Sequence, residues 1–490
     1  AAGFHVGLYT SPHLSSYNER IRIGGRPISK ANLSQLVTEL KPVFKRISED
    51  SKLGPPTEFE MGTAIAFLHF AYEKVDFAVV EVGLGGRLDS TNIIKPKITA
   101  ITNISLEHTD ILGKTLKEIA MEKAGIIKQG VPVVIGNQNP QVSKIIEDIA
   151  KRKSSHLIQV GKDIEYKKEL ASIDRQIVSI KTQNHIYNQL EIPLIGAHQI
   201  ENTAIAVGVI DTLREMGISI EDTQIKSGLH LVSWPGRLEI LQRKPMVLVD
   251  CAHNSDGAKR LKETVTELIK KQQITTVVGI SKDKPGEEIM SEILKFSDSI
   301  IATQSLSSRS GAMDPYEIFR IAQKNGLTAD LVKDPIKAVD KGLKKIGDAG
   351  ILIIAGSIYL VGNVRKHLLQ TAGKYPMNQR IIILVGALGS GKTEIALTYG
   401  KYLRTEHEKV CIVDFDIVNP YFRSRDAASL MRTFGVDIIS SNPGFESADL
   451  PSISPLVYKA FQDSTCQVIF DVGGDPIGSK ALRGFRRQFE

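Results

Sequence analysis

Carboxylate and histidine side chains follow short apolar segments at several places in the sequence. Glu81 ends the segment AVVE before a glycine-rich turn, and His108 comes after KITAITNIS. Asp250 and His253 come after MVLV. Short β-branched runs predict buried parallel strands, and ligands of open α/β sheets bind at the carboxyl ends of such strands. We expect the strands before Glu81 and His108 to be neighbours. Since carboxylates bind hard cations such as Mg²⁺, the pattern favours a binding site over helix-capping acids and surface histidines.

Two basic residues complete this candidate site. Lys123 lies in the predicted helix TLKEIAMEKAGII among apolar neighbours, although a solvated helix surface is the commoner place for a lysine. Arg237 follows Trp234-Pro235-Gly236, a break in the pattern that we interpret as a hinge between two domains. A guanidinium at a hinge can reach phosphates bound between the domains. The residues therefore indicate chemistry on a phosphorylated compound and leave the reaction open.

A phosphate-loop motif lies near the end of the sequence. The pattern G-x-x-x-x-G-K-[ST] occurs once, from Gly386 to Thr393, between the apolar segment IIILV and a predicted helix. Gly391 and Lys392 hold the required G-K positions. We expect Lys392 to reach the β- and γ-phosphates of a nucleotide and Thr393 to bind Mg²⁺.

Two aspartates follow this motif at the ends of further apolar segments. Asp414 ends KVCIVD and Asp471 ends QVIFD, where it has the place of a Walker-B acid. Strand, loop, helix and acids together resemble the ATPase superfamily that includes partitioning and cofactor-maturation NTPases. This resemblance implies a partial P-loop NTPase α/β domain.

The elements that must position these residues are strands and helices in alternation. Such alternation predicts α/β sheets with helices on both faces. Residues 156–193 differ, because HLIQV, RQIVSIKT and HIYNQLEI alternate with period two and predict an antiparallel flap. Breaks in the pattern divide the chain into residues 1–235, a smaller α/β domain at 236–370, a linker at 371–379 and a third α/β domain at 380–490.

Composition narrows the classes of function. With 490 residues, 42% of them hydrophobic and 24% charged, the chain is typical of a multidomain globular protein. Its three cysteines form no C-x-x-C pair, which fits the cytoplasm and argues against structural zinc. No apolar run is long enough to span a membrane, so we expect no membrane partner. The net charge of +7 is dispersed and only 6% of the residues are aromatic, which disfavours a nucleic-acid partner.

Long motifs are spread over residues 1–370: LYTSPHLSSYNERIRIGGRPIS, VEVGLGGRLDSTN, TNISLEHTDILGKTLKEIAMEKAGIIK, GAHQIENTAIA, WPGRLE, DCAHN and GSIYLVGNVR. In order and spacing they resemble the folylpolyglutamate synthase and dihydrofolate synthase family of Mur ligases. The resemblance implies a Mur-ligase-like central domain with an incomplete P-loop sheet, followed by a Rossmann-like C-terminal domain.

The resemblance also implies a reaction. Enzymes of this family use MgATP to phosphorylate a folate or pteroate carboxylate, and the amine of glutamate then attacks the acyl phosphate. We therefore expect ATP and Mg²⁺ as cofactors, and folate or dihydropteroate and L-glutamate as substrates. A monomer in the cytoplasm is the simplest expectation.

Residue roles follow from the same resemblance. Ser11, Glu81 and His108 would bind Mg²⁺, and Lys123 matches the lysine that these ligases carry as a carbamate. Glu81, His108 and Lys123 would thus form the catalytic group. Contacts with the nucleotide are implied for six further residues: His198, Gln199, Asn202, Arg237, Asp250 and His253.

The sequence departs from the family at its start. The family begins with a strand, a T-N-G-K-G-S phosphate loop and a helix, which precede the segment equivalent to HVGLYTSPHL. This sequence starts inside or just after that helix, so the amides and the lysine that would hold the ATP phosphates are missing. We expect little or no ligase activity from this chain. Met377 looks like the start of a second, incomplete reading frame joined to the first.

Two alternatives remain open. The chain is a nucleotide-binding switch or regulatory ATPase if only the loop Gly386–Thr393 functions. It is a different Mur-type amino-acid ligase if pteroate and folate fail to bind while another carboxylate substrate does.

Overall fold

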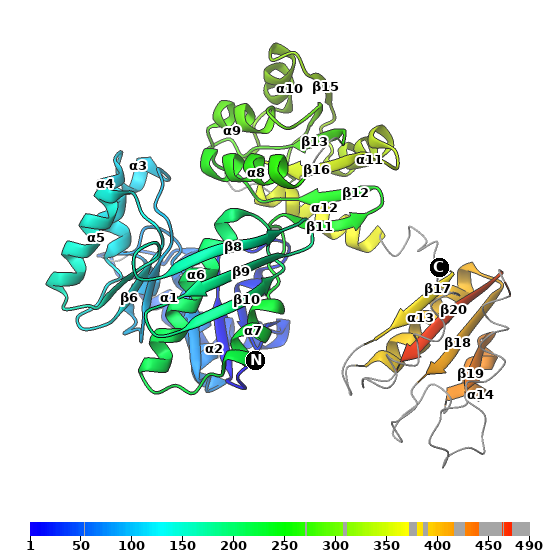
Figure 1. Ribbon diagram of the computed structural model, residues 1–490, viewed down its shortest axis with the longest axis horizontal. Helices are drawn as coiled ribbons and strands as arrows, with labels where there is room; N and C mark the ends of the chain where they lie inside the picture. The colour runs from blue at the N-terminus through cyan, green and yellow to red at the C-terminus, as the bar shows by residue number, and fades with distance from the viewer. Residues whose placement is uncertain are drawn as a thin grey trace. The chain divides into compact units, whose positions relative to one another are not determined.

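The computed structural model describes residues 1–52, 54–269, 272–306, 311–371, 380–385, 391–415, 427–440, 463 and 465–472. The chain divides into two compact units, Ala1–Leu369 and Gln370–Glu490, whose helices and strands are drawn in Figure 1. No helix among the described residues is long and apolar enough to cross a membrane.

A four-stranded sheet in the order β3-β2-β1-β4 opens the first unit. Strands β1 and β4 are parallel, so their carboxyl ends meet at one edge. A Cβ at Gly7 would lie only 2.8 Å from the ring of Phe70. The glycine thus allows α2 to pack directly on β1. Thr57 and Glu60 cap the start of α2 by exchanging hydrogen bonds. The elements are β1 Val6–Tyr9, η1 Tyr17–Arg20, β2 Ile21–Ile23, β3 Arg26–Pro27, α1 Lys30–Ser48, α2 Glu58–Tyr72 and β4 Phe77–Val80.

A separate parallel sheet in the order β5-β6-β7 follows. Because β4 and β5 end two different sheets, the prediction that the strands before Glu81 and His108 are neighbours is wrong for the described residues. The apolar faces of α4 and α5 cover this sheet through residues such as Ile119 and Ile146. The elements are η2 Ser90–Ile93, β5 Thr99–Ile101, α3 Thr109–Leu112, α4 Leu116–Ala124, β6 Val133–Ile135, α5 Pro140–Arg152 and β7 Leu157–Gln159.

The antiparallel flap contains β10, β9 and β8 in that order, and it packs against α6 (Figure 1). The segment HLIQV was assigned to the flap, but it forms β7 and pairs with β6 in parallel. Its place in the flap belongs to β8, whose residues EYKKELA are almost all exposed and carry no apolar alternation. The elements are β8 Glu165–Ala171, β9 Gln176–Lys181, β10 Ile186–Ile192, α6 Ala197–Glu215 and α7 Asp222–His230.

The second part of this unit is a six-stranded sheet in the order β11-β12-β16-β13-β14-β15. All of its pairings are parallel except that of β11 with β12. The elements are β11 Glu239–Arg243, β12 Met246–Val249, α8 Ser255–Leu268, β13 Ile274–Val278, α9 Gly286–Ile293, β14 Ser299–Ala302, α10 Pro315–Lys324, β15 Thr328–Leu331, α11 Pro335–Ile346, β16 Ile351–Ala355 and α12 Ile358–Thr371.

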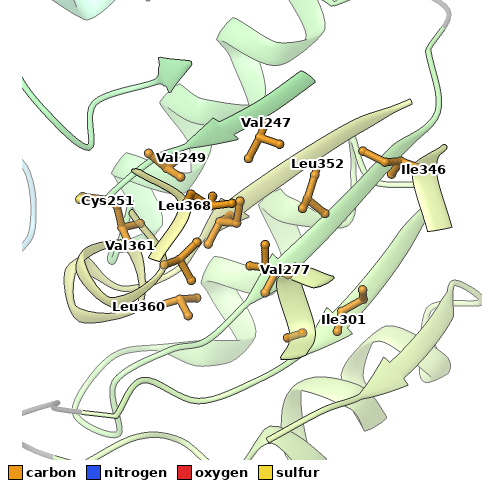
Figure 2. Close-up of a cluster of buried hydrophobic side chains, with 14 residues drawn as sticks. Val247, Val249, Cys251, Val277, Ile301, Ile346, Leu352, Leu360, Val361 and Leu368 are labelled. Carbon is orange, nitrogen blue, oxygen red and sulfur yellow. The ribbon is translucent and has the colours of Figure 1, made fainter. Parts of the chain in front are cut away.

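Both faces of this sheet are covered by helices. Figure 2 shows one apolar core, in which Val247 and Leu352 of the strands meet Leu360 and Val361 of α12. Side chains of successive strand residues point to opposite faces. Ile353 therefore packs on the other side, with α8. A doubly covered sheet explains why the neighbouring strands β12 and β16 are wholly apolar.

The second unit holds a parallel sheet in the order β17-β20-β18-β19. Helix α13 packs on it through Ala396 and Leu403, which share a buried cluster with Ile412 and Ile469. The elements are β17 Ile381–Leu384, α13 Lys392–Glu406, β18 Lys409–Phe415, α14 Ala428–Thr433, β19 Val436–Ser440 and β20 Cys466–Val472.

We expect Ile353→Ala to lower the free energy of unfolding by about 2–5 kcal/mol, because it opens a cavity beneath a fully buried strand residue. Ile353→Val should cost only about 0.5–1.5 kcal/mol. Leu369→Ala, at a position 48% exposed, is the control and should change stability by less than about 0.5 kcal/mol. Urea unfolding followed by circular dichroism measures all three, and equal losses for Ile353→Ala and Leu369→Ala would contradict the packing described.

Candidate active site

Ser11 and Glu81 meet where β1 and β4 end. The parallel register pairs Tyr9 with Val80, so each chain leaves the sheet at the same edge. The peptide N–H of Ser11 donates a hydrogen bond of 2.7 Å to Oε2 of Glu81. The protein around this carboxylate partly removes it from water, which raises its pKa. The Ser11 N–H and Arg237 act in the opposite direction. The strand-end acid is therefore held in a fixed orientation, facing an arginine.

The glycine-rich turn after Glu81 joins β4 to α4. A Cβ at Gly86 would lie 2.8 Å from the carbonyl oxygen of Glu122 and 2.9 Å from that of Lys123, so only glycine fits there. Arg87 reinforces the contact through an ion pair with Glu122, with 2.9 Å between Nη2 and Oε1. The turn thus fixes the end of the helix that carries Lys123.

Lys123 forms an ion pair with Glu107, with 2.8 Å between Nζ and Oε1. The next residue, His108, begins α3 with a left-handed backbone conformation, at a φ of 49°. His108 therefore lies in the loop that leads to a helix rather than at a strand end as predicted. Burial, followed by the charge of Lys284, lowers the pKa of His108 and favours the neutral ring that can bind a metal ion.

The segment expected to contact the nucleotide begins α6. His198 and Gln199 lie within hydrogen-bond distance, at 3.2 Å between their Nε2 atoms, and Asn202 donates to Oε1 of Gln199 at 3.2 Å. Burial lowers the pKa of His198 to about 4, helped by the charges of Arg260 and Arg237. A cluster of neutral hydrogen-bonding groups thus lies beside two arginines.

Asp250 and His253 follow β12. Asp250 is 9% exposed, and its carboxylate accepts hydrogen bonds from the N–H groups of Leu238 at 2.9 Å and Ala252 at 2.8 Å. Burial raises its pKa, while Arg237 and these two bonds oppose the rise. Nδ1 of His253 lies 2.9 Å from the carbonyl oxygen of Cys251, and burial lowers the pKa of this ring.

The charge of Arg237 acts on several of these groups. Its charge acts on the pKa of Glu81 from the four-stranded sheet and on that of His198 from α6. It also acts on the pKa values of Asp250 and His253, which follow β12 of the six-stranded sheet. The structure thus brings together strand ends that are far apart in the sequence.

Sequence reasoning missed three charged residues near this group. Glu107 and Lys284 affect the pKa of both His108 and His253, and Arg260 affects that of His198. Glu107 stands next to His108 in the sequence, which could have drawn attention to it. Lys284 lies in the loop after β13 and had no comparable signal.

The donor atoms suit a hard cation. Within the described residues, no three His, Cys, Asp or Glu side chains gather closely enough to hold a metal ion. Mg²⁺ needs fewer protein ligands, because it keeps several waters and binds substrate phosphates. The Glu81 carboxylate, the Ser11 hydroxyl and a neutral His108 offer suitable atoms of that kind.

Comparison with known proteins gives the family. The profile of the Mur ligase middle domain matches residues 33–210, and that of the dihydrofolate synthetase C-terminal domain matches residues 237–370. The dihydrofolate synthase/folylpolyglutamate synthase of Bacillus subtilis is 37% identical over 370 residues, which cover 75% of this chain and 85% of that protein. The chain belongs to this family.

Solved structures of folylpolyglutamate synthases share the fold. That of Thermotoga maritima is 32% identical, with a TM-score of 0.66, and the match covers 75% of this chain and 83% of that one. That of Mycobacterium tuberculosis, complexed with ADP and AMPPCP, is 30% identical, with a TM-score of 0.70, covering 75% and 85%. The predicted α/β Mur-ligase-like fold and the resemblance to this synthase family are therefore confirmed over about three-quarters of the chain.

The second unit, Gln370–Glu490, carries the remaining predicted residues. Asp414 and Asp471 are register partners on β18 and β20, 4% and 2% exposed. Gly391, at a φ of 80°, precedes α13, which starts with Lys392 and Thr393. Gly386 lies outside the described residues. The two acids thus lie side by side near the carboxyl ends of their strands.

We expect Arg237→Gln to raise the pKa of His198 from about 4, because removal of a nearby cation makes the imidazolium less unfavourable. Burial and Arg260 remain, so the pKa should stay below that of an ordinary histidine. An NMR titration of the histidine rings, assigned with His198→Gln, measures the change.

The control for this titration is Arg243→Gln, which removes an exposed arginine paired with Asp174. It should leave the pKa of His198 where it is. A pKa of His198 that stays the same in Arg237→Gln would contradict the charge interaction.

Proposed function

We propose that the unit Ala1–Leu369 joins L-glutamate to the carboxylate of a folate or dihydropteroate, with MgATP as the phosphate donor. The observation that carries this proposal is that the charge of Arg237 acts on Glu81, His198, Asp250 and His253, which come from different elements of the unit. The homologues, which are ATP-dependent glutamate ligases, support it. They do not favour another Mur-type amino-acid ligase.

The proposed reaction has two steps. A carboxylate oxygen of the folate substrate attacks the γ-phosphorus of ATP, and the bond to ADP breaks. The neutral amine of glutamate then attacks the carbonyl carbon of the acyl phosphate, and inorganic phosphate leaves as the amine loses a proton. Both steps gather negative charge on phosphate oxygens, so preorganised cationic groups accelerate them.

Arg237 supplies such a cation. Its guanidinium can donate several hydrogen bonds to phosphate oxygens in a fixed geometry. Gln199 and Asn202, already hydrogen-bonded to each other, offer amide groups to the nucleotide. Mg²⁺, held by Ser11, Glu81 and His108, would neutralise phosphate charge when bound.

Lys123 requires a further proposal. A carbamate forms when its neutral amine adds CO₂ and releases a proton, which turns a cation into an anion. The Lys123 amine lies 2.8 Å from the Glu107 carboxylate. Two anions repel at this distance unless a cation lies between them, so a carbamate at Lys123 agrees with cation binding beside Glu107.

We also propose that residues 380–490 form a partial P-loop NTPase domain. The parallel sheet, the left-handed Gly391 before α13 and the paired Asp414 and Asp471 support this assignment. The divisions at residues 235 and 370 remain part of the same proposal, as do the monomeric state and the cytoplasmic location.

Mass-spectrometric detection of glutamate addition tests the ligase. The chain is incubated with MgATP, glutamate and either tetrahydrofolate or dihydropteroate, beside a version preceded by a strand, phosphate loop and helix of the family type. We expect glutamate addition to the folate or dihydropteroate substrate. Absence of product from both, in folded protein, would sink the proposal.

In the extended version, we expect Arg237→Ala to reduce the rate of glutamate addition roughly 10²–10³-fold, because one preorganised cation is lost. Arg243→Ala serves as the matched control and should retain the rate. Lys392→Ala should also retain it if the second unit is a separate site. A rate unaffected by Arg237→Ala would remove this residue from the mechanism.

Lys392→Ala tests the second unit by itself. Equilibrium dialysis with ATP and Mg²⁺ should show loss of one bound nucleotide, because the amine that reaches the phosphates is removed. Lys409→Ala is the control. It changes a lysine that lies at the start of β18, away from Asp414, and that pairs with Asp463 at 3.1 Å, and this variant should bind nucleotide as before. Equal nucleotide binding by Lys392→Ala and the unsubstituted chain would rule out the proposed loop.

A further inference from the structure

The loop between β1 and η1 contacts helix α12 through its backbone. A Cβ built on Gly362 would lie only 2.0 Å from the carbonyl oxygen of Leu14. The side chain of Leu14 packs against the apolar core beneath α12, which contains Leu360 and Val361 (Figure 2). The loop that contains the segment TSPHL therefore packs directly against α12, which covers the six-stranded sheet.

Hydrogen bonds hold this loop together as one body. The carboxylate of Glu19 accepts the N–H groups of Leu14 at 2.9 Å and of Ser16 at 2.9 Å, and it also accepts that of Ser15. Three residues before Leu14 along the chain, the N–H of Ser11 binds Glu81. A shift of Leu14 therefore moves residues 14–16 together, three residues along the chain from the Ser11 amide.

Helix α12 is itself fixed to the hinge. Arg365 forms an ion pair with Glu239, with 2.8 Å between Nε and Oε2, and Oε2 of Glu239 accepts the N–H of Gly236 at 2.8 Å. A Cβ at Gly236 would lie 3.5 Å from the Leu14 side chain. Leu14 thus lies where the loop, the hinge and α12 meet.

We propose that the contact between Leu14 and Gly362 is a positioning contact, which sets the Ser11 amide against Glu81 and so tunes cation binding at Glu81. Neither residue touches the reacting atoms. The inference rests on the proposed function only in naming a cation as the ligand. The contact itself is a property of the chain.

Glycine is required at position 362 for a steric reason. Alanine would place a carbon within 2.0 Å of a backbone oxygen, and a backbone cannot rotate away as a flexible side chain can. The helix is anchored by its buried face and by Arg365, so the loop is the part that must move. The expected consequence is a weakened hydrogen bond between Ser11 and Glu81.

The experiment compares Gly362→Ala with Gly342→Ala in the full chain. Gly342→Ala, in α11, is the matched control, because the three atoms nearest its Cβ all belong to side chains, the closest being that of Leu352 at 2.5 Å. Hydrogen–deuterium exchange of a peptide spanning residues 10–16 is the first measurement. We expect about tenfold faster exchange in Gly362→Ala and no change in Gly342→Ala, since local opening sets exchange rates.

Leu14→Ala provides a second variant, which removes the anchoring side chain and leaves Gly362 intact. It should speed exchange in the same peptide. Unchanged exchange in both Gly362→Ala and Leu14→Ala, or an equal increase in all three variants, would overturn the positioning contact. Circular dichroism verifies that each variant is folded.

Mn²⁺ binding, followed by electron paramagnetic resonance, tests the link to the cation. The difference between the chain and Glu81→Gln isolates the site, and Gly362→Ala should weaken this component several-fold. Faster exchange with unaltered Mn²⁺ affinity would overturn the tuning role. If Glu81→Gln itself has no effect on Mn²⁺, the proposed metal role of Glu81 fails while the exchange result still decides the contact.

Discussion

The hydrogen-bonded turn at the hinge is the constraint on which the ligase-like site depends. Gly236 has a φ of 78°, and a Cβ there would lie 2.7 Å from a buried sulfur, so the turn requires glycine. Glu239 closes the turn through the Gly236 N–H and is itself held by Arg365. Arg237 lies inside this turn, which fixes the backbone from which its side chain extends. A cation without such a support would lose much of its preorganisation.

The fixed charge of Arg237 has opposite effects on its neighbours. It favours the ionised forms of Glu81 and Asp250, whose burial acts the other way. It disfavours the imidazolium forms of His198 and His253, in the same direction as burial. One arginine thus favours the ionised form of the acids against burial, and adds to burial in favouring neutral histidines. A site for a nucleotide phosphate with a metal ion needs this combination, because protonated histidines would compete with the metal.

Local patterns in the sequence predicted the parts of this site that depend on single strands. The ends of β4 and β12 gave Glu81 and Asp250, since an apolar run followed by an acid is visible without tertiary structure. Lys284 joins the group only after two domains have packed, and no local pattern encodes that. The strand β8 escaped prediction because its residues face solvent on both sides. The role proposed for Gly362 could not be predicted from the sequence either, because it depends on the loop backbone that contacts the helix at this glycine.

The functions proposed for the two units require phosphate to be held by different means. In the first unit, the guanidinium of Arg237 would supply the positive charge. The groups on which its charge acts are side chains, such as those of Glu81 and His198. In the second, the strand before the phosphate-loop motif, β17, pairs with β20, which carries Asp471, and β20 pairs with β18, which carries Asp414. The strand that leads into the motif and the two acids therefore belong to one sheet. A strand before the motif that shares its sheet with two acids supports the proposal that the trailing motif serves its own nucleotide rather than the glutamate ligase.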